Sequence, residues 1–161
     1  MKPSHRLLFS SLLLITLPSV AKEFSISNGD NAGLVKAITQ ANASPEADVI
    51  TLAKHGLYAI SAPASRNCLL PTFRNTLTIE GNGAEIRRYT KASVFLVSTE
   101  KNSNVTLRNL ILAEGSKGAL VNNGDLLLDH VKIVDSNSGT GRAVGQTHVG
   151  LDRIFCVHGR A

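Results

Sequence analysis

The apolar and polar positions in the C-terminal half of the chain repeat one short pattern. Four segments carry it: TLTIEGNGAEI, NVTLRNLILAE, DLLLDHVKIVD and HVGLDRIFCVH, which begin at residues 76, 104, 125 and 148. In the last three segments alternate residues are apolar, a polar pair interrupts the alternation, and the alternation then resumes. A period of two residues is typical of a β-strand with one buried face. Each segment is therefore predicted to form a strand, a bend and a second strand.

The spacing of these segments indicates that they stack. The third apolar position falls at Ile79, Leu107, Leu128 and Leu151, at intervals of 28, 21 and 23 residues. Intervals of this size are typical of repeat proteins, in which each unit lacks enough core of its own and a neighbour about 4.8 Å away supplies it. Two inward ladders are expected, namely Leu107, Leu128 and Leu151, and Leu110, Val131 and Ile154.

Stacked units of this kind form a parallel β-helix, and each strand–bend–strand unit is one rung. An antiparallel β-sandwich of short strands would explain the alternation equally well. It would not explain why the unit returns with its register intact, so the β-helix is the favoured prediction.

The preceding part of the chain predicts one helix and a strand pair. Residues 31–44 place Leu34, Val35, Ile38 and Ala41 on one helical face, and Asp30 or Asn31 can cap the start. Residues 48–60 are predicted as strand, turn at His55-Gly56, and strand. Residues 61–75 contain two prolines and no period, which predicts a loop.

The N-terminus has the layout of a secretory signal. MKPSHR is basic, LLFSSLLLITL is apolar, and Ser19 and Ala21 supply small residues before a cleavage point. A membrane-spanning helix needs about 20 apolar residues, more than this run contains. Residues 1–21 are therefore predicted to be a signal peptide. Residues 22–161 are predicted to be one β-helix domain, with a helix at 31–44 and rungs over 75–161.

Composition and charge argue against nucleic-acid binding and leave the state of the cysteines to be considered. Without Lys2 and Arg6 the formal charge falls from +5 to +3, and the basic run at residues 86–88 is isolated. We therefore expect no nucleic-acid partner. The chain has two cysteines, and an exported protein can pair them. Cys156 occupies an inward position, so a buried free thiol is expected there, and the state of Cys68 is left open.

The order of these segments resembles a known group. NAGLVKAITQANA, ADVITLAKHGLYAI, LPTF, LTIEGNGAEIRR, NVTLRNLIL and NNGDLLLDHVKI follow one another as in exported right-handed parallel β-helix proteins of the pectin-lyase-like superfamily. More narrowly, the chain looks like the N-terminal part of bacterial polymorphic outer-membrane or choice-of-anchor repeat proteins. The Cys of their helix-start signature is missing from residues 32–37. The resemblance implies an all-β, right-handed β-helix whose N-terminal helix caps the open end.

Lyases on this scaffold bind Ca²⁺ through acidic residues on neighbouring rungs, so the resemblance directs attention to the outward columns. Arg108, Asp129 and Asp152 follow the inward leucines and are expected to stack. A calcium ion needs 6–8 oxygen ligands, and Arg108 is a poor neighbour for a cation. A surface ion pair between Arg108 and Asp129 is the favoured interpretation, and Ca²⁺ is expected only if the chain is a lyase.

No side chain stands out as catalytic. The Asn-Thr-Asp, Asp-Asp and Gly-His-Gly runs of polygalacturonase-type hydrolases do not occur, and VHGR at residues 157–160 resembles the last only superficially. His130 is expected at a bend beside Asn109 and Arg153, bonded to backbone rather than acting as a base. His55 and Asn82 are interpreted as turn residues. The sequence therefore predicts no catalytic, cofactor-binding or metal-binding residue.

The favoured function is that of a non-enzymatic exported protein, either secreted, periplasmic or on the outer membrane or cell surface. It would be adhesin-like or contact an extracellular polysaccharide or cell-surface glycan. The alternatives are an N-terminal fragment of a polysaccharide lyase or glycoside hydrolase, and an inactive truncated remnant. No transmembrane segment is expected after signal removal. The pattern stops without a cap, so truncation and self-association through the last rung are also expected.

Overall fold

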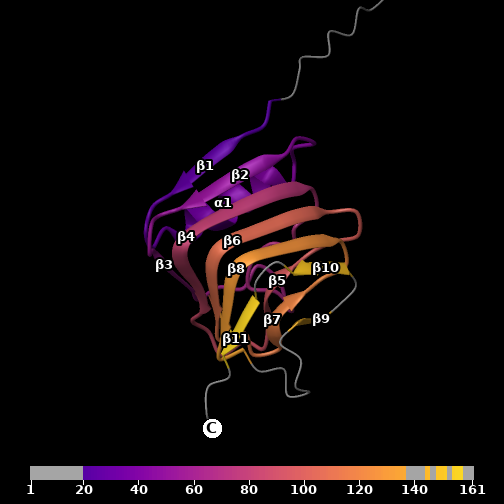
Figure 1. Ribbon diagram of the computed structural model, residues 1–161. Helices are drawn as coiled ribbons and strands as arrows, with labels where there is room; N and C mark the ends of the chain where they lie inside the picture. Colours follow the sequence, from indigo (N-terminus) through magenta and orange to yellow (C-terminus); the bar gives the residue numbers. More distant parts are fainter. Residues whose placement is uncertain (1–19, 137–143, 146–147, 152–153, 158–161) are drawn as a thin grey trace, which may run out of the picture.

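A computed structural model describes residues 20–136, 144–145, 148–151 and 154–157, and within them the chain is mostly β (Figure 1). The larger sheet contains β1 (Glu23–Ile26), β2 (Asp48–Leu52), β3 (Leu57–Ile60), β4 (Thr76–Arg88), β6 (Asn104–Ala113), β8 (Asp125–Val134), β10 (His148–Leu151) and β11 (Ile154–Val157). The smaller sheet contains β5 (Phe95–Ser98), β7 (Gly118–Val121) and β9 (Val144–Gly145). The helix α1 spans Asn31–Ala41.

The described strands pair in parallel, in the order β1-β2-β4-β6-β8-β10, with β3 on β4 and β11 on β8. Consecutive strands of the stack come from consecutive repeats, as Figure 1 shows. The antiparallel sandwich is therefore wrong for these strands. Parallel pairing lets each rung satisfy its backbone groups on the rungs before and after it.

The predicted ladders have the expected register. Ile79 pairs with Leu107 and Leu107 with Leu128, and Leu151 follows on β10. Leu110 likewise pairs with Val131, which pairs with Ile154. Ile79, Leu107 and Leu128 are fully buried in one continuous hydrophobic cluster. Alternation along the sequence thus becomes a stacked aliphatic core because register is kept from rung to rung.

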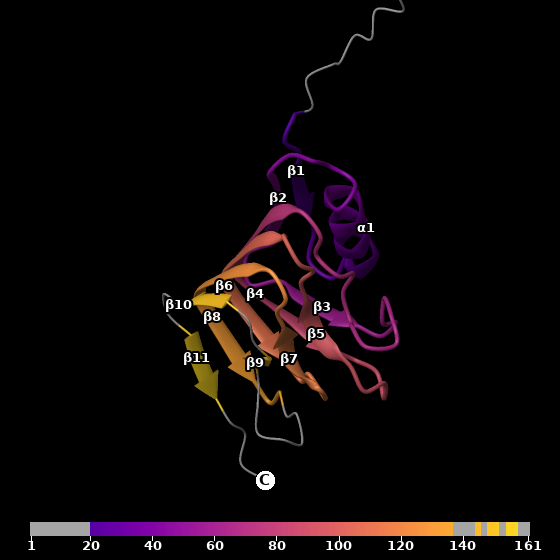
Figure 2. The same ribbon diagram turned by 90° about the vertical axis from the view of Figure 1, so that its right-hand side faces the viewer.

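Helix α1 lies at the β1 end of the stack (Figure 2). Asp30 is its N-cap, and its side chain accepts a hydrogen bond from the Gly33 N–H at 2.8 Å. Leu34, Ala37, Ile38 and Ala41 are buried in the core cluster, while Val35 is only partly buried. The apolar face of α1 therefore covers core residues at this end of the sheet.

The helix ends at Ala41 rather than at the predicted residue 44. Pro45 disfavours helical backbone in the residue before it. In addition, the Asn75 side-chain amide donates to the carbonyl oxygens of Ala41, Asn42 and Ser44, at 3.4, 2.9 and 2.5 Å. A residue distant in the sequence thus takes over the carbonyl groups that a longer helix would have used.

The sequence pattern did not predict the smaller sheet. β5 and β7 are short, largely buried along their length, and pair in parallel. Strands buried on both faces show no alternation, so a two-residue period cannot reveal them. The loop predicted at residues 61–75 is present, but Leu69, Leu70 and Phe73 within it are fully buried. This loop closes over core residues instead of lying free in solvent.

Candidate functional site

Four successive bends among the described residues of the larger sheet have a residue with a positive φ angle. These residues are His55, Asn82, Asn109 and His130, with φ of 52°, 52°, 48° and 53°. Together we call them the bend column. Left-handed backbone is unfavourable for most L-residues, and Asn and His tolerate it better than β-branched residues. The recurrence of Asn and His at this point therefore has a conformational cause.

The bend column is kept in register by a bulge in β4. Glu80 pairs with Arg108 and Ala84 with Leu110, so three β4 residues lie opposite Asn109 alone. A side chain on Gly81 would place its Cβ 2.5 Å from the Asn109 carbonyl oxygen. Only glycine permits this close backbone approach. The bulge adds residues to this repeat without displacing the ladders on either side.

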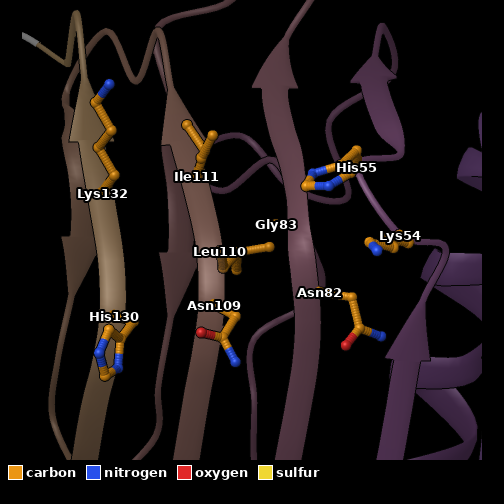
Figure 3. Close-up of a pocket in the computed structure, with 9 residues that line it drawn as sticks. All are labelled: Lys54, His55, Asn82, Gly83, Asn109, Leu110, Ile111, His130 and Lys132. Carbon is orange, nitrogen blue, oxygen red and sulfur yellow. The ribbon is translucent and has the colours of Figure 1, made fainter.

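The bend column lines an open groove of about 560 Å³ on the outside of the sheet. Figure 3 shows Asn82, Asn109 and His130 in a row across three neighbouring strands, with His55 and Lys54 beside them. The full lining comprises Lys54, His55, Asn82, Gly83, Asn109, Leu110, Ile111, His130 and Lys132. The groove therefore carries two ammonium groups, two imidazoles and two amides over a partly apolar floor.

Hydrogen bonds hold the two amides in place. The Asn82 Nδ2 donates to the Leu52 carbonyl oxygen at 3.0 Å, and the Asn109 Nδ2 donates to Glu80 Oε1 at 2.9 Å. The His55 N–H donates to the Asn82 carbonyl oxygen at 3.1 Å. These contacts tie neighbouring rungs together at the bend, so the row of polar side chains is organised before any ligand binds.

His130 belongs to a small ionic network. Its Nδ1 lies 2.5 Å from Asp129 Oδ1, and Asp129 Oδ2 lies 3.5 Å from the Arg108 Nε. The predicted ion pair between Arg108 and Asp129 is thus present. The expectation that His130 would bond to backbone is wrong, because its imidazole contacts the neighbouring carboxylate instead. In the neutral tautomer that donates Nδ1–H to Asp129, Nε2 is an acceptor.

A second ionic cluster surrounds Arg87, near the C-terminal end of β4. The Arg87 Nε lies 2.5 Å from Glu85 Oε1, and its Nη1 lies 3.9 Å from Glu114 Oε1. The hydrogen bond that Arg87 donates to Glu85 raises the pKa of Arg87, desolvation lowers it, and the negative charges of Glu85, Glu114 and Asp135 raise it further. Because arginine is already protonated at physiological pH, the raised pKa leaves the charge of the Arg87 side chain unchanged there.

The described residues contain no cluster of three or more His, Cys, Asp or Glu side chains that could hold a metal ion. Asp152 and Arg153, which were predicted to extend the columns of Asp129 and His130, lie outside the described residues.

Cys68 is buried with a free thiol. Cys156 pairs through its backbone with Ile133 on β8. No helix in the described part of the chain is long and apolar enough to cross a membrane.

Sequence reasoning named His55, Asn82, Asn109 and His130 only as turn residues and missed the groove that they share. Lys54 and Lys132 were missed altogether. A usable signal was present, since Asn or His recurs at the polar interruption of successive repeats. Only the register of the strands shows that these residues lie side by side on one surface.

No protein-family model, curated protein or solved structure matches this chain.

Proposed function

We propose that this chain is an exported right-handed parallel β-helix protein that contacts an extended polysaccharide through the groove along the bend column. The observation that carries this proposal is the row of polar side chains repeated from strand to strand across the groove. Neighbouring strands are about 4.8 Å apart, a spacing close to the length of one sugar unit in an extended chain. Successive rungs can then contact successive sugars.

The side chains that line the groove are chemically suited to a glycan ligand. Amide and imidazole groups donate and accept hydrogen bonds, which suits ring hydroxyl groups. Lys54 and Lys132 add positive charge at the groove and favour sugars that carry carboxylates. The chain lacks Trp, so binding would depend on hydrogen bonds and charge rather than on stacking of sugars on indole rings.

Three further observations support the β-helical fold that this proposal includes. Parallel strands stack in register, aliphatic ladders line the interior, and α1 lies at one end. The pectin-lyase-like resemblance supplies the right-handed coil and the extracellular setting, together with the signal at residues 1–21. The proposed location is outside the inner membrane, either secreted, periplasmic or at the cell surface.

A polysaccharide lyase is the second candidate, favoured by one contact. Asp129 orients the His130 imidazole at the groove, and Lys132 lies two residues further on. An oriented imidazole can take a proton from a sugar carbon. Incubation with polygalacturonate, with and without Ca²⁺, would show unsaturated products at 235 nm if this candidate is right. We expect binding without product.

Binding is tested with immobilised acidic and neutral polysaccharides and the exported protein. The double variant K54A/K132A should lose at least about 10-fold in affinity for polygalacturonate, because two charge-assisted contacts are removed. The matched control is K91A/K101A, which removes two exposed lysines that do not line the groove. Equal loss in both variants would indicate non-specific charge attraction and contradict a groove site.

A further inference from the structure

The first strand of the sheet begins beside a buried carboxylate. Asp48 is only 1% exposed and pairs with Leu77, so its side chain occupies an inward column that is otherwise apolar. The next residues of that column are Val105 and Leu126, both buried. A carboxylate in such a place is unfavourable unless it is hydrogen-bonded and paired with a positive charge.

The partners found for Asp48 are incomplete. Oδ1 accepts from the Lys22 backbone N–H at 2.7 Å, and the Ser44 hydroxyl lies 3.5 Å away. Oδ2 is buried and has no hydrogen-bond partner among the described residues. None of the ion pairs found in the described part of the chain includes Asp48. The carboxylate thus has a good hydrogen bond at one oxygen and no matching charge.

The donor to Asp48 is the nitrogen at the predicted signal cleavage point. Ser19 and Ala21 are the small residues that precede the Ala21–Lys22 bond. Val20 is 72% exposed, and Ala21 and Lys22 are exposed as well. Lys22 is also held through its carbonyl oxygen, which accepts a hydrogen bond from the Val49 N–H at 2.9 Å. The Ala21–Lys22 peptide bond therefore lies between an exposed segment and Lys22, the first residue that is hydrogen-bonded to β2.

We propose that cleavage between Ala21 and Lys22 is a maturation step in which the new α-ammonium of Lys22 pairs with the buried Asp48 carboxylate and locks β1 onto β2. This inference rests on the export included in the proposed function. Hydrolysis by a host signal peptidase adds the oxygen of water to the Ala21 carbonyl carbon. The C–N bond breaks, and the Lys22 nitrogen keeps the electron pair and becomes protonated.

The product supplies what Asp48 lacks. An ammonium group has three N–H donors instead of one, and it carries a full positive charge. One donor keeps the contact to Oδ1, and another is free to serve Oδ2. The pair would hold the edge strand β1, whose Ile26 carbonyl oxygen accepts from the buried Tyr58 hydroxyl at 2.9 Å. Before cleavage, the uncompensated carboxylate leaves this end of the sheet less stable, which suits a chain that has yet to cross a membrane.

The test uses the full-length gene in an exporting bacterial host. The intact mass of the exported wild type should correspond to a chain that starts at Lys22. A variant with one alanine inserted after Ala21 should be cut to start with that alanine, which restores an amide at Lys22. Its melting temperature should be lower than that of the wild type by about 5 °C, as expected for loss of a buried ion pair in a chain of this size.

The role of Asp48 is tested in the same pair of chains. In a D48N background the inserted alanine should change the melting temperature by less than about 1 °C, because the partner charge is gone. E46Q is the matched control: it neutralises a carboxylate two residues away that is not buried, and the 5 °C difference should persist. If D48N does not fold, labelling of the α-amine at neutral pH replaces it, and the wild type should react at least about 10-fold more slowly than the extended chain, because a protonated, paired amine is a poor nucleophile.

The outcomes separate the two proposals. An exported chain that starts at Lys22 but melts and reacts like the extended chain would overturn the ion pair and leave export standing. A different first residue would overturn the cleavage point. A chain that stays in the host cytoplasm with residues 1–21 attached would overturn export. The ion pair is then tested after cutting at an engineered protease site whose product starts at Lys22, and equal melting with and without the added alanine would overturn it.

Discussion

Two columns of residues run across the same strands and differ in almost every property. The inward column of Ile79, Leu107 and Leu128 is fully buried. The bend column of His55, Asn82, Asn109 and His130 lines an open groove, and its last three members lie two or three positions after Ile79, Leu107 and Leu128. Strand spacing and register are shared, so the difference arises from what each position requires. The inward column requires apolar volume, whereas the bend column requires a backbone with positive φ.

The largest expected effect comes from opening the inward column. L107A removes a fully buried side chain between Ile79 and Leu128 and should lower the free energy of unfolding by about 3–5 kcal/mol, through lost burial and a cavity. Urea denaturation followed by circular dichroism measures it. T106A, at the half-buried neighbouring position, is the control and should change the free energy of unfolding by less than about 1 kcal/mol. A similar loss in both variants would show that the column is not a continuous core.

A smaller effect tests whether polar groups inside the core depend on their partners. The Tyr58 hydroxyl is buried, donates to the Ile26 carbonyl oxygen at 2.9 Å and accepts from the Ala53 N–H at 3.1 Å. Y58F removes both bonds of the hydroxyl and leaves only the direct bond from the Ala53 N–H to the Ile26 carbonyl oxygen at 3.0 Å, so it should cost about 0.5–1.5 kcal/mol in unfolding free energy. Y89F, at a tyrosine that is 74% exposed, should be neutral in the same thermal melts. Equal values for the two variants would contradict this account of β1 anchoring.

The bend column can be tested by separating its backbone role from its side-chain role. Asn109 has φ of 48°, so N109A should destabilise by about 1 kcal/mol, whereas N109G should be nearly neutral in thermal melts. Both variants remove the amide from the groove and should weaken polysaccharide binding about equally, by a few-fold as expected for one hydrogen bond. If N109G bound as well as the wild type, the side chain would have only a conformational role.

The smallest effect is expected at the ion pair beside the bend. Arg108 and Asp129 lie 3.5 Å apart with side chains 46% and 31% exposed, so a double-mutant cycle with R108A and D129A should give about 0–1 kcal/mol. The coupling should fall further in 1 M salt, because screening shortens the reach of exposed charges. A coupling above 2 kcal/mol that resists salt would instead indicate a structural ion network supporting His130.

Prediction from sequence succeeded where one physical requirement dominates a position. Leu107 and Leu110 were placed inward by alternation alone, because burial of one strand face leaves a period of two. The N-cap was narrowed to Asp30 or Asn31, since the capping side chain and the helix start are neighbours in sequence, and the structure selects Asp30. The end of α1 was missed by three residues because Asn75, far along the chain, binds its last carbonyl groups. The strands β5 and β7 were missed because buried positions on both faces leave no period to detect.

The candidate site was predicted only in fragments. Asn82, Asn109 and His130 were recognised as bend residues, but their meeting in one groove depends on the bulge at Gly81 and on parallel register. The contact between His130 and Asp129 was not anticipated, because it depends on side-chain orientations rather than on residue type. Lys54 and Lys132 gave no local signal, since isolated exposed lysines occur on any surface.

The sequence by itself determined the repeat, the inward ladders, the first turn of α1 and the bends, because each follows from side-chain burial or backbone preference within a few residues. The sequence also favoured parallel pairing over an antiparallel sandwich. Only the tertiary structure decided that the bend column lines one groove and that Asp48 meets the Lys22 nitrogen in the core. Those two outcomes join residues more than twenty positions apart. Their distance in space depends on how many residues each rung contains, and a local pattern does not reveal that.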